Sequence, residues 1–176
     1  MSTGTELKRL RGKQTQQQMA FEFEGISREA WSSYETGRNR IPPDIASKAV
    51  NKYDDPQFAM ELASEYTGGA WAPMLNGPAV DLHRTSVQTR TLDEMQEAYD
   101  AIKNAVLNIQ PGYIGNFEKQ DIEKSLDEAA DAVTFLNAYI AVICKEYHVS
   151  WIKLWTRHKA KLISRGFLKM MGGKKK

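Results

Sequence analysis

Two short helices joined by a glycine turn are the feature that most constrains the fold of this 176-residue chain. They lie in the segment TQQQMAFEFEGISREAWSSYETGRNRIP, residues 15–42. Thr15 and Ser27 each stand where an N-cap is expected, because their side-chain oxygens can accept a free backbone N–H of the first turn. Gly25 lies between the helices, where a positive φ costs little only for glycine. The spacing therefore predicts two capped helices held at an angle.

The second of these helices, REAWSSYET, has an apolar side and a polar side. Trp31 and Tyr34 lie three residues apart, so both can face a core. The opposite side is then left for solvent or for a ligand. We expect the outward residues to be Arg28, Glu29, Ser32 and Ser33. Their spacing is typical of a recognition helix that enters the major groove of DNA.

Residues 4–66 resemble the lambda-repressor-like (Xre/Cro) helix-turn-helix family. The matching residues are Thr15-Gln16, Met19-Ala20, Gly25-Ile26-Ser27-Arg28, Trp31, Tyr34-Glu35, Gly37, Arg40 and Pro42. Compared with the family, the turn has one extra residue, Glu24, which changes the expected tilt between the two helices. The resemblance implies binding of a double-stranded DNA operator. The residues expected at the DNA are Gln16, Ser27, Arg28, Glu29, Ser32, Ser33, Arg38 and Arg40.

Different roles are expected within this DNA-binding set. Arg28 begins the recognition helix, from which a guanidinium can reach guanine O6 and N7 together, and Ser32 follows one turn later. Gln16, Arg38 and Arg40 are expected to contact the DNA backbone instead.

The composition indicates a folded, all-α protein. Hydrophobic residues make up 41% of the chain and charged residues 26%, which argues against disorder. No segment shows the alternation typical of a strand, and no apolar run approaches the roughly 20 residues that span a bilayer. The single cysteine, Cys144, has apolar neighbours and is expected to be a buried thiol. We therefore expect a cytoplasmic protein with no membrane partner.

The helical segments predict two domains joined by a linker. Residues 1–66 are expected to form a bundle of four to five short helices, and residues 67–90, rich in Gly, Pro and Asn, a flexible linker. Three longer helices are expected in residues 91–176, at about 91–109, 118–147 and 150–165. In the first of them, an apolar stripe is expected to consist of Leu92, Met95, Tyr99, Ile102, Val106 and Ile109.

The net charge of +2 hides an uneven distribution. Residues 1–66 carry nine basic and ten acidic residues, residues 67–144 five and eleven, and residues 145–176 ten and one. Three interpretations of the basic C-terminal segment stay open: contact with DNA phosphates, solvated lysines at the end of a helix, and, for the final GGKKK, an addition from cloning.

The helix at 118–147 predicts a homodimer. One stripe runs through Leu126, Ala129, Val133, Leu136, Ile140 and Ile143, and beyond Asp131 the opposite side also becomes apolar. A helix that is apolar all round is buried on several sides. Two other helices can hardly supply that burial, so we expect a second copy of the chain to pack on this helix.

Four carboxylates suggest an alternative function. Glu94 and Glu97 are one turn apart on one predicted helix, and Glu128 and Asp131 are one turn apart on the next. Pairs at this spacing on facing helices can offer oxygen ligands to Mg²⁺. The pattern Asp93-Glu94-x-x-Glu97 followed by Glu128-x-x-Asp131 resembles MazG-like all-α nucleotide pyrophosphohydrolases. That resemblance implies Mg²⁺-dependent attack of water on a nucleoside triphosphate, with release of pyrophosphate.

The sequence thus favours a DNA-binding transcriptional regulator of phage or mobile-element type, homodimeric through its C-terminal helices, with no catalytic residues and no cofactor. One alternative is a Mg²⁺-dependent nucleoside triphosphate pyrophosphohydrolase domain fused to a helix-turn-helix. Another is a protein-interaction adaptor, favoured by the weak charge of residues 1–66. No glycine-rich phosphate loop and no Ser-His-Asp arrangement is apparent.

Overall fold

The computed structural model describes residues 2–169, and this part of the chain contains helices and no strand, which confirms the predicted all-α fold. The helices are α1 (Thr3–Arg11), α2 (Gln16–Glu22), α3 (Arg28–Glu35), α4 (Pro43–Tyr53), α5 (Pro56–Tyr66), α6 (Arg84–Asn104), α7 (Asn116–Glu146) and α8 (Trp151–Ser164), with a short 3-10 helix, η1 (Pro111–Tyr113). The final GGKKK, whose role the sequence leaves open, lies outside the described residues.

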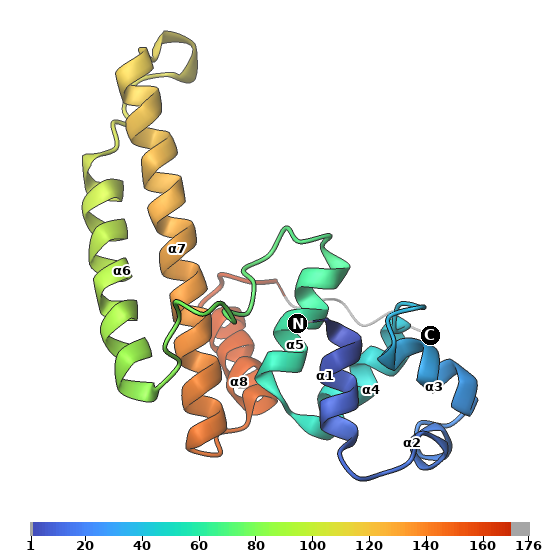
Figure 1. The fold of residues 1–176 in the computed structure, drawn as a ribbon. Coiled ribbons are helices and arrows are strands. Elements are labelled where there is room, and N and C mark those ends of the chain that lie inside the picture. The colour runs from blue at the N-terminus through green and yellow to red at the C-terminus, as the bar shows by residue number, and fades with distance from the viewer. Residues whose placement is uncertain (1, 170–176) are drawn as a thin grey trace.

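Two regions of different shape make up the molecule (Figure 1). Helices α1–α5 form a compact bundle, with α1 packed against both α3 and α5. Helices α6 and α7 lie antiparallel as a long arm that extends away from this bundle. No described helix combines the length and the apolar character that a membrane span requires.

Both predicted N-caps are present. The Thr15 hydroxyl oxygen accepts the backbone N–H of Gln18 at 3.2 Å, and the Gln18 side chain accepts the N–H of Thr15 in return, which makes a capping box. The Ser27 hydroxyl oxygen accepts the N–H of Ala30 at 3.1 Å. These bonds satisfy donors that the first turn of each helix would otherwise leave free, so they define where α2 and α3 begin.

The bundle α1–α5 has a complete hydrophobic core. Trp31 is fully buried, with its ring centroid 4.8 Å from that of Phe23. Tyr34 is also buried, so the predicted inward placement of Trp31 and Tyr34 is confirmed. The buried cluster comprises Leu7, Met19, Phe23, Trp31, Tyr34, Ile41, Ile45, Ala46, Ala49, Phe58 and Leu62. Residues from all five helices contribute to it, and the region therefore contains the apolar burial that a small domain needs.

Helix α1 approaches the end of α3 closely at Gly4. A Cβ added to Gly4 would lie 2.3 Å from the carbonyl oxygen of Tyr34 and 2.8 Å from that of Glu35. Those atoms belong to the backbone and have little room to move, so only glycine allows α1 to pack at this distance.

The turn between α2 and α3 contains two residues with positive φ. Glu24 has a φ of 40° and Gly25 a φ of 80°, so two consecutive residues adopt the left-handed region. Glycine tolerates this conformation, whereas for a residue with a Cβ it costs about 1 kcal/mol. Glu24 therefore allows the turn between the two helices at some cost in stability.

Helices α6 and α7 pack along one seam on each helix. Its residues recur at steps of four and three, the spacing of helices that pack side by side. On α6 they are Val87, Thr91, Glu94 and Ala98, all buried, and on α7 they are Ser125, Glu128, Ala132, Phe135, Tyr139 and Val142. The Thr91 hydroxyl donates to the Phe135 carbonyl at 3.1 Å, which ties the two helices together.

The structure corrects the predicted start and orientation of α6. The helix covers residues 84–104 instead of 91–109, because Val87 and Thr91 extend the seam into the polar segment that was assigned to the linker. The predicted apolar stripe does not face α7. Glu94, which lies outside the stripe, is 3% exposed, while Leu92 of the stripe is 59% exposed. Helix α6 has two adjacent faces that could pack against α7. The face that does so is the more polar one, which contains Thr91 and Glu94.

The connection between the two regions is more than a flexible linker. The Asp54 side chain, at the end of α4, accepts the backbone N–H of Ile152 at 2.8 Å, at the start of α8. Helix α5 also contacts α7 directly. From the connecting segment, Leu75 and Leu82 pack against the buried cluster of α6 and α7. The segment that joins the regions is thus shortened to residues 67–83 and partly anchored.

Candidate functional site

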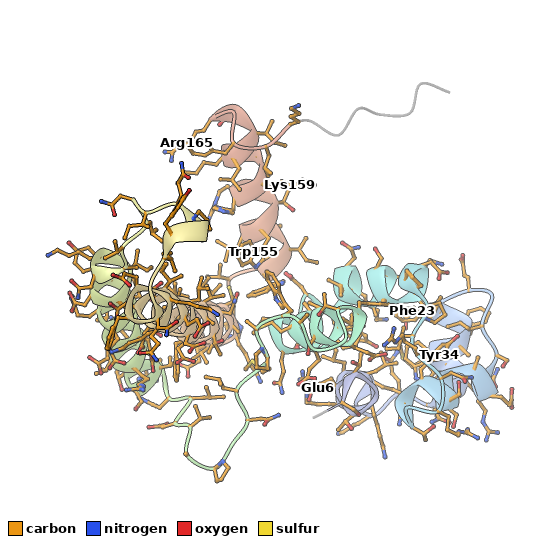
Figure 2. The ribbon with its side chains drawn as sticks, turned by 90° about the horizontal axis from the view of Figure 1, so that it is seen from above. Glu6, Phe23, Tyr34, Trp155, Lys159 and Arg165 are labelled. Atoms are coloured by element: carbon orange, nitrogen blue, oxygen red, sulfur yellow. The ribbon has the colours of Figure 1, made fainter. Side chains whose placement is uncertain are left out.

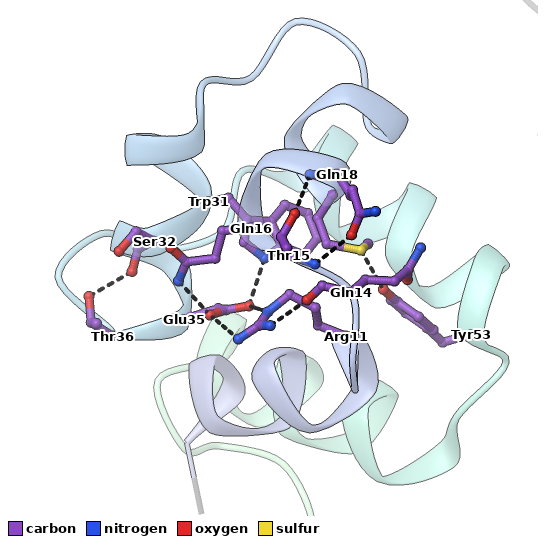
Figure 3. Close-up of polar contacts among 11 residues, drawn as sticks. Arg11, Gln14, Thr15, Gln16, Gln18, Trp31, Ser32, Glu35, Thr36 and Tyr53 are labelled. Atoms are coloured by element: carbon purple, nitrogen blue, oxygen red, sulfur yellow. Dashed lines mark hydrogen bonds and ion pairs between the residues drawn. The ribbon is translucent and has the colours of Figure 1, made fainter.

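Helix α3, the predicted recognition helix, is anchored through a buried glutamate (Figure 3). The Glu35 carboxylate accepts bonds from Arg11 Nε at 2.5 Å, from Gln16 Nε2 at 2.8 Å and from Trp31 Nε1 at 2.7 Å. These donors come from α1, α2 and α3. One carboxylate therefore sets the relative positions of the three helices that form the helix-turn-helix region.

The ionisation of Glu35 depends on these donors. Burial raises the pKa of this carboxyl, but the bonds from Arg11, Gln16 and Trp31 favour the charged form more strongly. The net result is a pKa below the usual value of 4.5. Glu35 is thus a buried charge whose two carboxylate oxygens both accept hydrogen bonds.

The opposite face of α3 is open. Arg28 and Glu29 are exposed, and neither has a hydrogen bond or ion pair with another described residue. Ser32 is half-buried beside them. A hollow of about 570 Å³ extends over this face, lined by Arg28, Glu29, Ala30, Ser32, Ser33, Arg38 and Asn39. An exposed cation without a partner at the N-terminus of a helix can bind a ligand without first breaking an ion pair.

Ser33, which was expected on the outer side of α3, is buried instead. It is 7% exposed, and its hydroxyl donates to the Ala30 carbonyl at 2.7 Å and accepts from Asn39 Nδ2 at 3.1 Å. The α-helical rotation from Ser32 to Ser33 turns the second serine toward the following loop. This placement favours a structural role for Ser33, in holding the loop after α3.

Two of the residues that were predicted to contact the DNA backbone already form hydrogen bonds within the protein. Gln16 donates to Glu35, as described above. Arg40 turns toward α5, where its Nη2 donates to the Glu65 carbonyl at 3.0 Å and its Nε pairs with the Glu65 carboxylate at 3.1 Å. The guanidinium also lies 5.9 Å from the centroid of the Tyr66 ring. These contacts favour a role for Arg40 in fixing the loop against α5.

The loop after α3 contributes two residues to the open face. Arg38 is exposed, and within the described chain its guanidinium bonds only the Thr36 hydroxyl, at 3.2 Å. Asn39 lines the same hollow, although sequence reasoning did not select it. Its position beside two predicted residues, in a loop that directly follows the recognition helix, is the signal that could have identified it. Ser27, at the other end, serves as the N-cap of α3.

Helix α8 carries cations without partners (Figure 2). Lys153, Arg157, Lys159 and Lys161 lie along it, and none of them forms an ion pair with a described residue. Trp151 and Trp155 stack edge to face on this helix at 5.5 Å. No residue of α8 is buried.

The structure brings together three of the four predicted metal ligands. Carboxylate oxygens of Glu94, Glu128 and Asp131 lie within 4.8 Å of one another, between α6 and α7. Glu97, the fourth, is exposed and does not belong to this group. It instead lines a hollow of about 420 Å³, together with Asp100, Ala101, Asn104, Asp121, Lys124 and Glu128. Glu128 thus belongs both to the cluster and to the hollow beside it.

Glu94 is the most unusual member of this cluster. Burial raises the pKa of its carboxyl, the Arg90 guanidinium lowers it, and the nearby Asp131, Glu97 and Glu128 raise it again, leaving it above the usual value. Arg90 Nη2 lies 2.5 Å from Glu94 Oε1, so one of the two carboxylate oxygens already has a partner. The donor set of hard oxygens fits a divalent cation such as Mg²⁺, with Arg90 as its competitor.

Comparison of the chain with protein-family models, curated proteins and solved structures finds no match. We therefore infer its function from the residues and their geometry.

Proposed function

We propose that this protein is a sequence-specific DNA-binding transcriptional regulator. The observation that carries the proposal is the division of α3 into two faces. Its inner face is held by Trp31 and Glu35, which link it to α1 and α2. Its outer face presents Arg28 and Glu29 without internal partners. A rigidly held helix with free polar side chains at its N-terminal end is the arrangement that reads base edges in the major groove.

The roles of the outer residues follow from their chemistry. Arg28 has two parallel donors for guanine O6 and N7, and Glu29 can accept from cytosine N4. Ser32, one turn further along, can donate to or accept from a neighbouring base. Arg38 is available for a phosphate, whereas the engagement of Arg40 with Glu65 leaves it less suited to one. We thus place base reading on α3 and phosphate contact on the loop that follows.

Two copies of the chain would read an operator with two half-sites. Helix-turn-helix dimers bind half-sites separated by about one turn of DNA or a multiple of it. The proposed setting is the cytoplasm, in a regulator of phage or mobile-element type. The buried thiol of Cys144, the single cysteine, agrees with a reducing compartment.

The test combines selection of a binding site with two matched substitutions. Binding sites are selected from random duplexes, and affinity for the best site is measured by fluorescence anisotropy. Arg28→Ala should weaken specific binding by about 1–3 kcal/mol and relax the preference at one base pair. Lys48→Ala removes an exposed cation from a different helix, α4, and should leave specific binding nearly unchanged. Failure to select any preferred site, or equal effects of both changes, would contradict the proposal and favour an adaptor.

A second candidate function is Mg²⁺-dependent hydrolysis of nucleoside triphosphates with release of pyrophosphate. The observation that favours it is the convergence of Glu94, Glu128 and Asp131 within 4.8 Å, beside a hollow of about 420 Å³. These three residues would hold the cation, and Glu97 would face the nucleotide from the hollow. A bound Mg²⁺ would supply Lewis-acid stabilisation of phosphate oxygens. Lys124, which lines the hollow, can attract the phosphate chain.

This second function is tested first by metal binding and then by activity. Calorimetry with Mg²⁺ or Mn²⁺ should show binding to the wild type that Glu128→Gln abolishes, whereas Gln120→Glu, on the exposed surface of the same helix, should keep it. Pyrophosphate release from a panel of nucleoside triphosphates should follow the same order. If the metal does not bind and no pyrophosphate is released above the level of Glu128→Gln, only the regulator remains.

A further inference from the structure

Helices α6 and α7 each carry a second seam beside the one that joins them. On α6 it consists of Leu92, Met95, Tyr99 and Ile102, and on α7 of Ile122, Leu126, Ala129, Val133, Leu136, Ile140 and Ile143. The steps between neighbours are again three and four, so each set forms a continuous stripe along its helix. A helix with two such stripes has packing surfaces for two neighbours, and within the hairpin it meets only one.

The two second seams lie on the same side of the hairpin. Each follows the first seam by one residue, as Leu92 follows Thr91 and Leu126 follows Ser125, which rotates it by about 100° around the helix. The rotation has the same sense in both helices when each is followed from its N-terminus to its C-terminus. Since α6 and α7 are antiparallel and face each other, equal rotations bring both stripes to one side. Together they form a single surface, which we call the second-seam face.

This second-seam face is apolar and exposed in a single chain. Its most exposed residues are Leu92 at 59%, Met95 at 44%, Tyr99 at 60%, Ile102 at 52%, Leu126 at 64% and Val133 at 47%. The other seam residues on α7 are half-buried. No charged residue occupies any of these eleven seam positions. Soluble proteins rarely expose a contiguous apolar surface of this kind unless it is an interface.

We propose that the second-seam face packs against the same face of a second copy, so that two α6–α7 hairpins form a four-helix bundle. A four-helix bundle requires two neighbouring apolar stripes on every helix, and the hairpin has them on both of its helices. The face is its own complement, because apolar stripes of equal spacing can interdigitate across a two-fold axis. This inference deepens the proposed dimeric regulator by naming the surface that joins its copies.

The size of the second-seam face suits a dimer. The α7 stripe, from Ile122 to Ile143, is about 30 Å long, and the α6 stripe covers about half of that length. Two helices packed side by side present a strip about 20 Å wide. Pairing two such strips would bury on the order of 1,200 Å² in total, at the lower end of the range for stable interfaces. A second copy is therefore a sufficient occupant, without a larger partner.

The lack of a core in this half of the chain also points to a second copy. The buried hydrophobic cluster of the hairpin contains only Val87, Ala138 and Val142 among the described residues. Helix α8, which could have covered the second-seam face, has no buried residue. Six of the eleven second-seam residues are thus exposed in the described chain, and every copy has the same deficit.

The proposed bundle leaves the carboxylate cluster accessible. Glu97 and Asp131 each lie one position before a residue of the seam that joins α6 and α7, namely Ala98 and Ala132. The residues of the second seams lie one position after that seam instead. These carboxylates therefore lie on the opposite flank of the hairpin from the second-seam face. Dimerisation and metal binding would use different surfaces.

The experiment compares two double variants with equal added charge. Tyr99→Glu with Leu126→Glu places two carboxylates on the second-seam face, where both side chains are exposed in the single chain and folding should be preserved. The control, Gln96→Glu with Gln120→Glu, changes exposed residues of the same helices outside both seams. Light scattering at tens of micromolar should give the wild type and the control about twice the chain mass of 19.9 kDa, and the seam variant 19.9 kDa. Circular dichroism should show equal helix content in all three.

A wild type that stays at 19.9 kDa, or a seam variant that still doubles, would overturn the proposal. A second measurement needs no variant. In the full-length wild type, the thermal unfolding midpoint of the α6–α7 region should rise with protein concentration, because association stabilises the folded state. A midpoint independent of concentration would also overturn it. Specific DNA binding by the wild type can persist in each of these cases, so failure of the dimer is distinguishable from failure of the regulator.

Discussion

The two regions of this protein differ in how far each completes its own core. Helices α1–α5 enclose a buried cluster of eleven hydrophobic residues within about 65 residues of chain. The hairpin of α6 and α7 is nearly as long but buries a cluster of only three, and several of its large apolar side chains are exposed. The first region can therefore be stable as a single copy, whereas the second has the surface of an assembly component.

Their buried carboxylates differ in the same way. Glu35 in the first region accepts bonds from three side chains, and the pKa of its carboxyl is lowered. Glu94 in the hairpin has one cation beside it and carboxylates around it, and its pKa is raised. A satisfied buried charge fixes helix positions, while a crowded one stores repulsion that a cation would relieve. The first arrangement is typical of a scaffold and the second of a candidate ligand site.

The largest expected difference between the regions comes from removing one aromatic ring from each. Phe58→Ala should reduce the free energy of unfolding by about 3–5 kcal/mol, because Phe58 is fully buried and its loss leaves a cavity. Tyr99→Ala should change the stability of a single copy by less than about 0.5 kcal/mol, because Tyr99 is exposed. Urea unfolding at low protein concentration provides the comparison. Similar losses for both would contradict the difference between the regions.

Removing the charge of Glu35 should cost nearly as much. Glu35→Gln leaves Arg11 without its counter-charge and should destabilise the first region by about 3 kcal/mol. Because the pKa of Glu35 is lowered, its contribution is complete above the usual value of 4.5 and is lost as the pH falls through the lowered pKa. Thermal unfolding at a series of pH values should show an acid-induced loss that is smaller in Glu35→Gln. Parallel pH profiles would contradict this assignment.

A methyl group at Gly4 should have an intermediate effect. Gly4→Ala places a Cβ 2.3 Å from the Tyr34 carbonyl oxygen and must push α1 away from α3. We expect a loss of about 1–3 kcal/mol, confined to the first region. The control is Gly12→Ala, because no atom lies within 4 Å of the added Cβ there while φ is 59°. It measures the cost of backbone strain without a clash. Equal losses at both positions would show that the close approach of α1 and α3 is not the cause.

The smallest expected effect is a gain. Glu24 has a left-handed φ of 40°, and Glu24→Gly should stabilise the first region by about 0.5–1 kcal/mol by relieving that strain. Glu22→Gly, at the last residue of α2, is the comparison. It adds backbone freedom to a helical residue and removes the ion pair with Lys52, so it should destabilise by a similar amount. Differential scanning calorimetry would resolve the two shifts. A loss at position 24 would mean that the turn does not strain the chain.

Local sequence signals predicted the first region well. The caps at Thr15 and Ser27, the turn at Gly25 and the inward pair Trp31 and Tyr34 all follow from contacts within a few residues, which is why the spacing alone predicts them. The placement of Ser33 and Arg40 could not be predicted in this way. Each depends on a partner in another segment: Asn39 of the following loop for Ser33, and Glu65 of α5 for Arg40.

The sequence by itself determined the all-α class, the capped helices and the spacing of the carboxylates on α6 and α7. It also contained both seams of the hairpin, because a repeat of three and four residues is a property of the chain. Only the tertiary structure decided which seam packs. The choice depends on the total burial along two long helices, including the polar residues Thr91 and Glu94. That sum is set by the partner helix, so an apolar stripe that periodicity assigns to a core can remain exposed for a second copy.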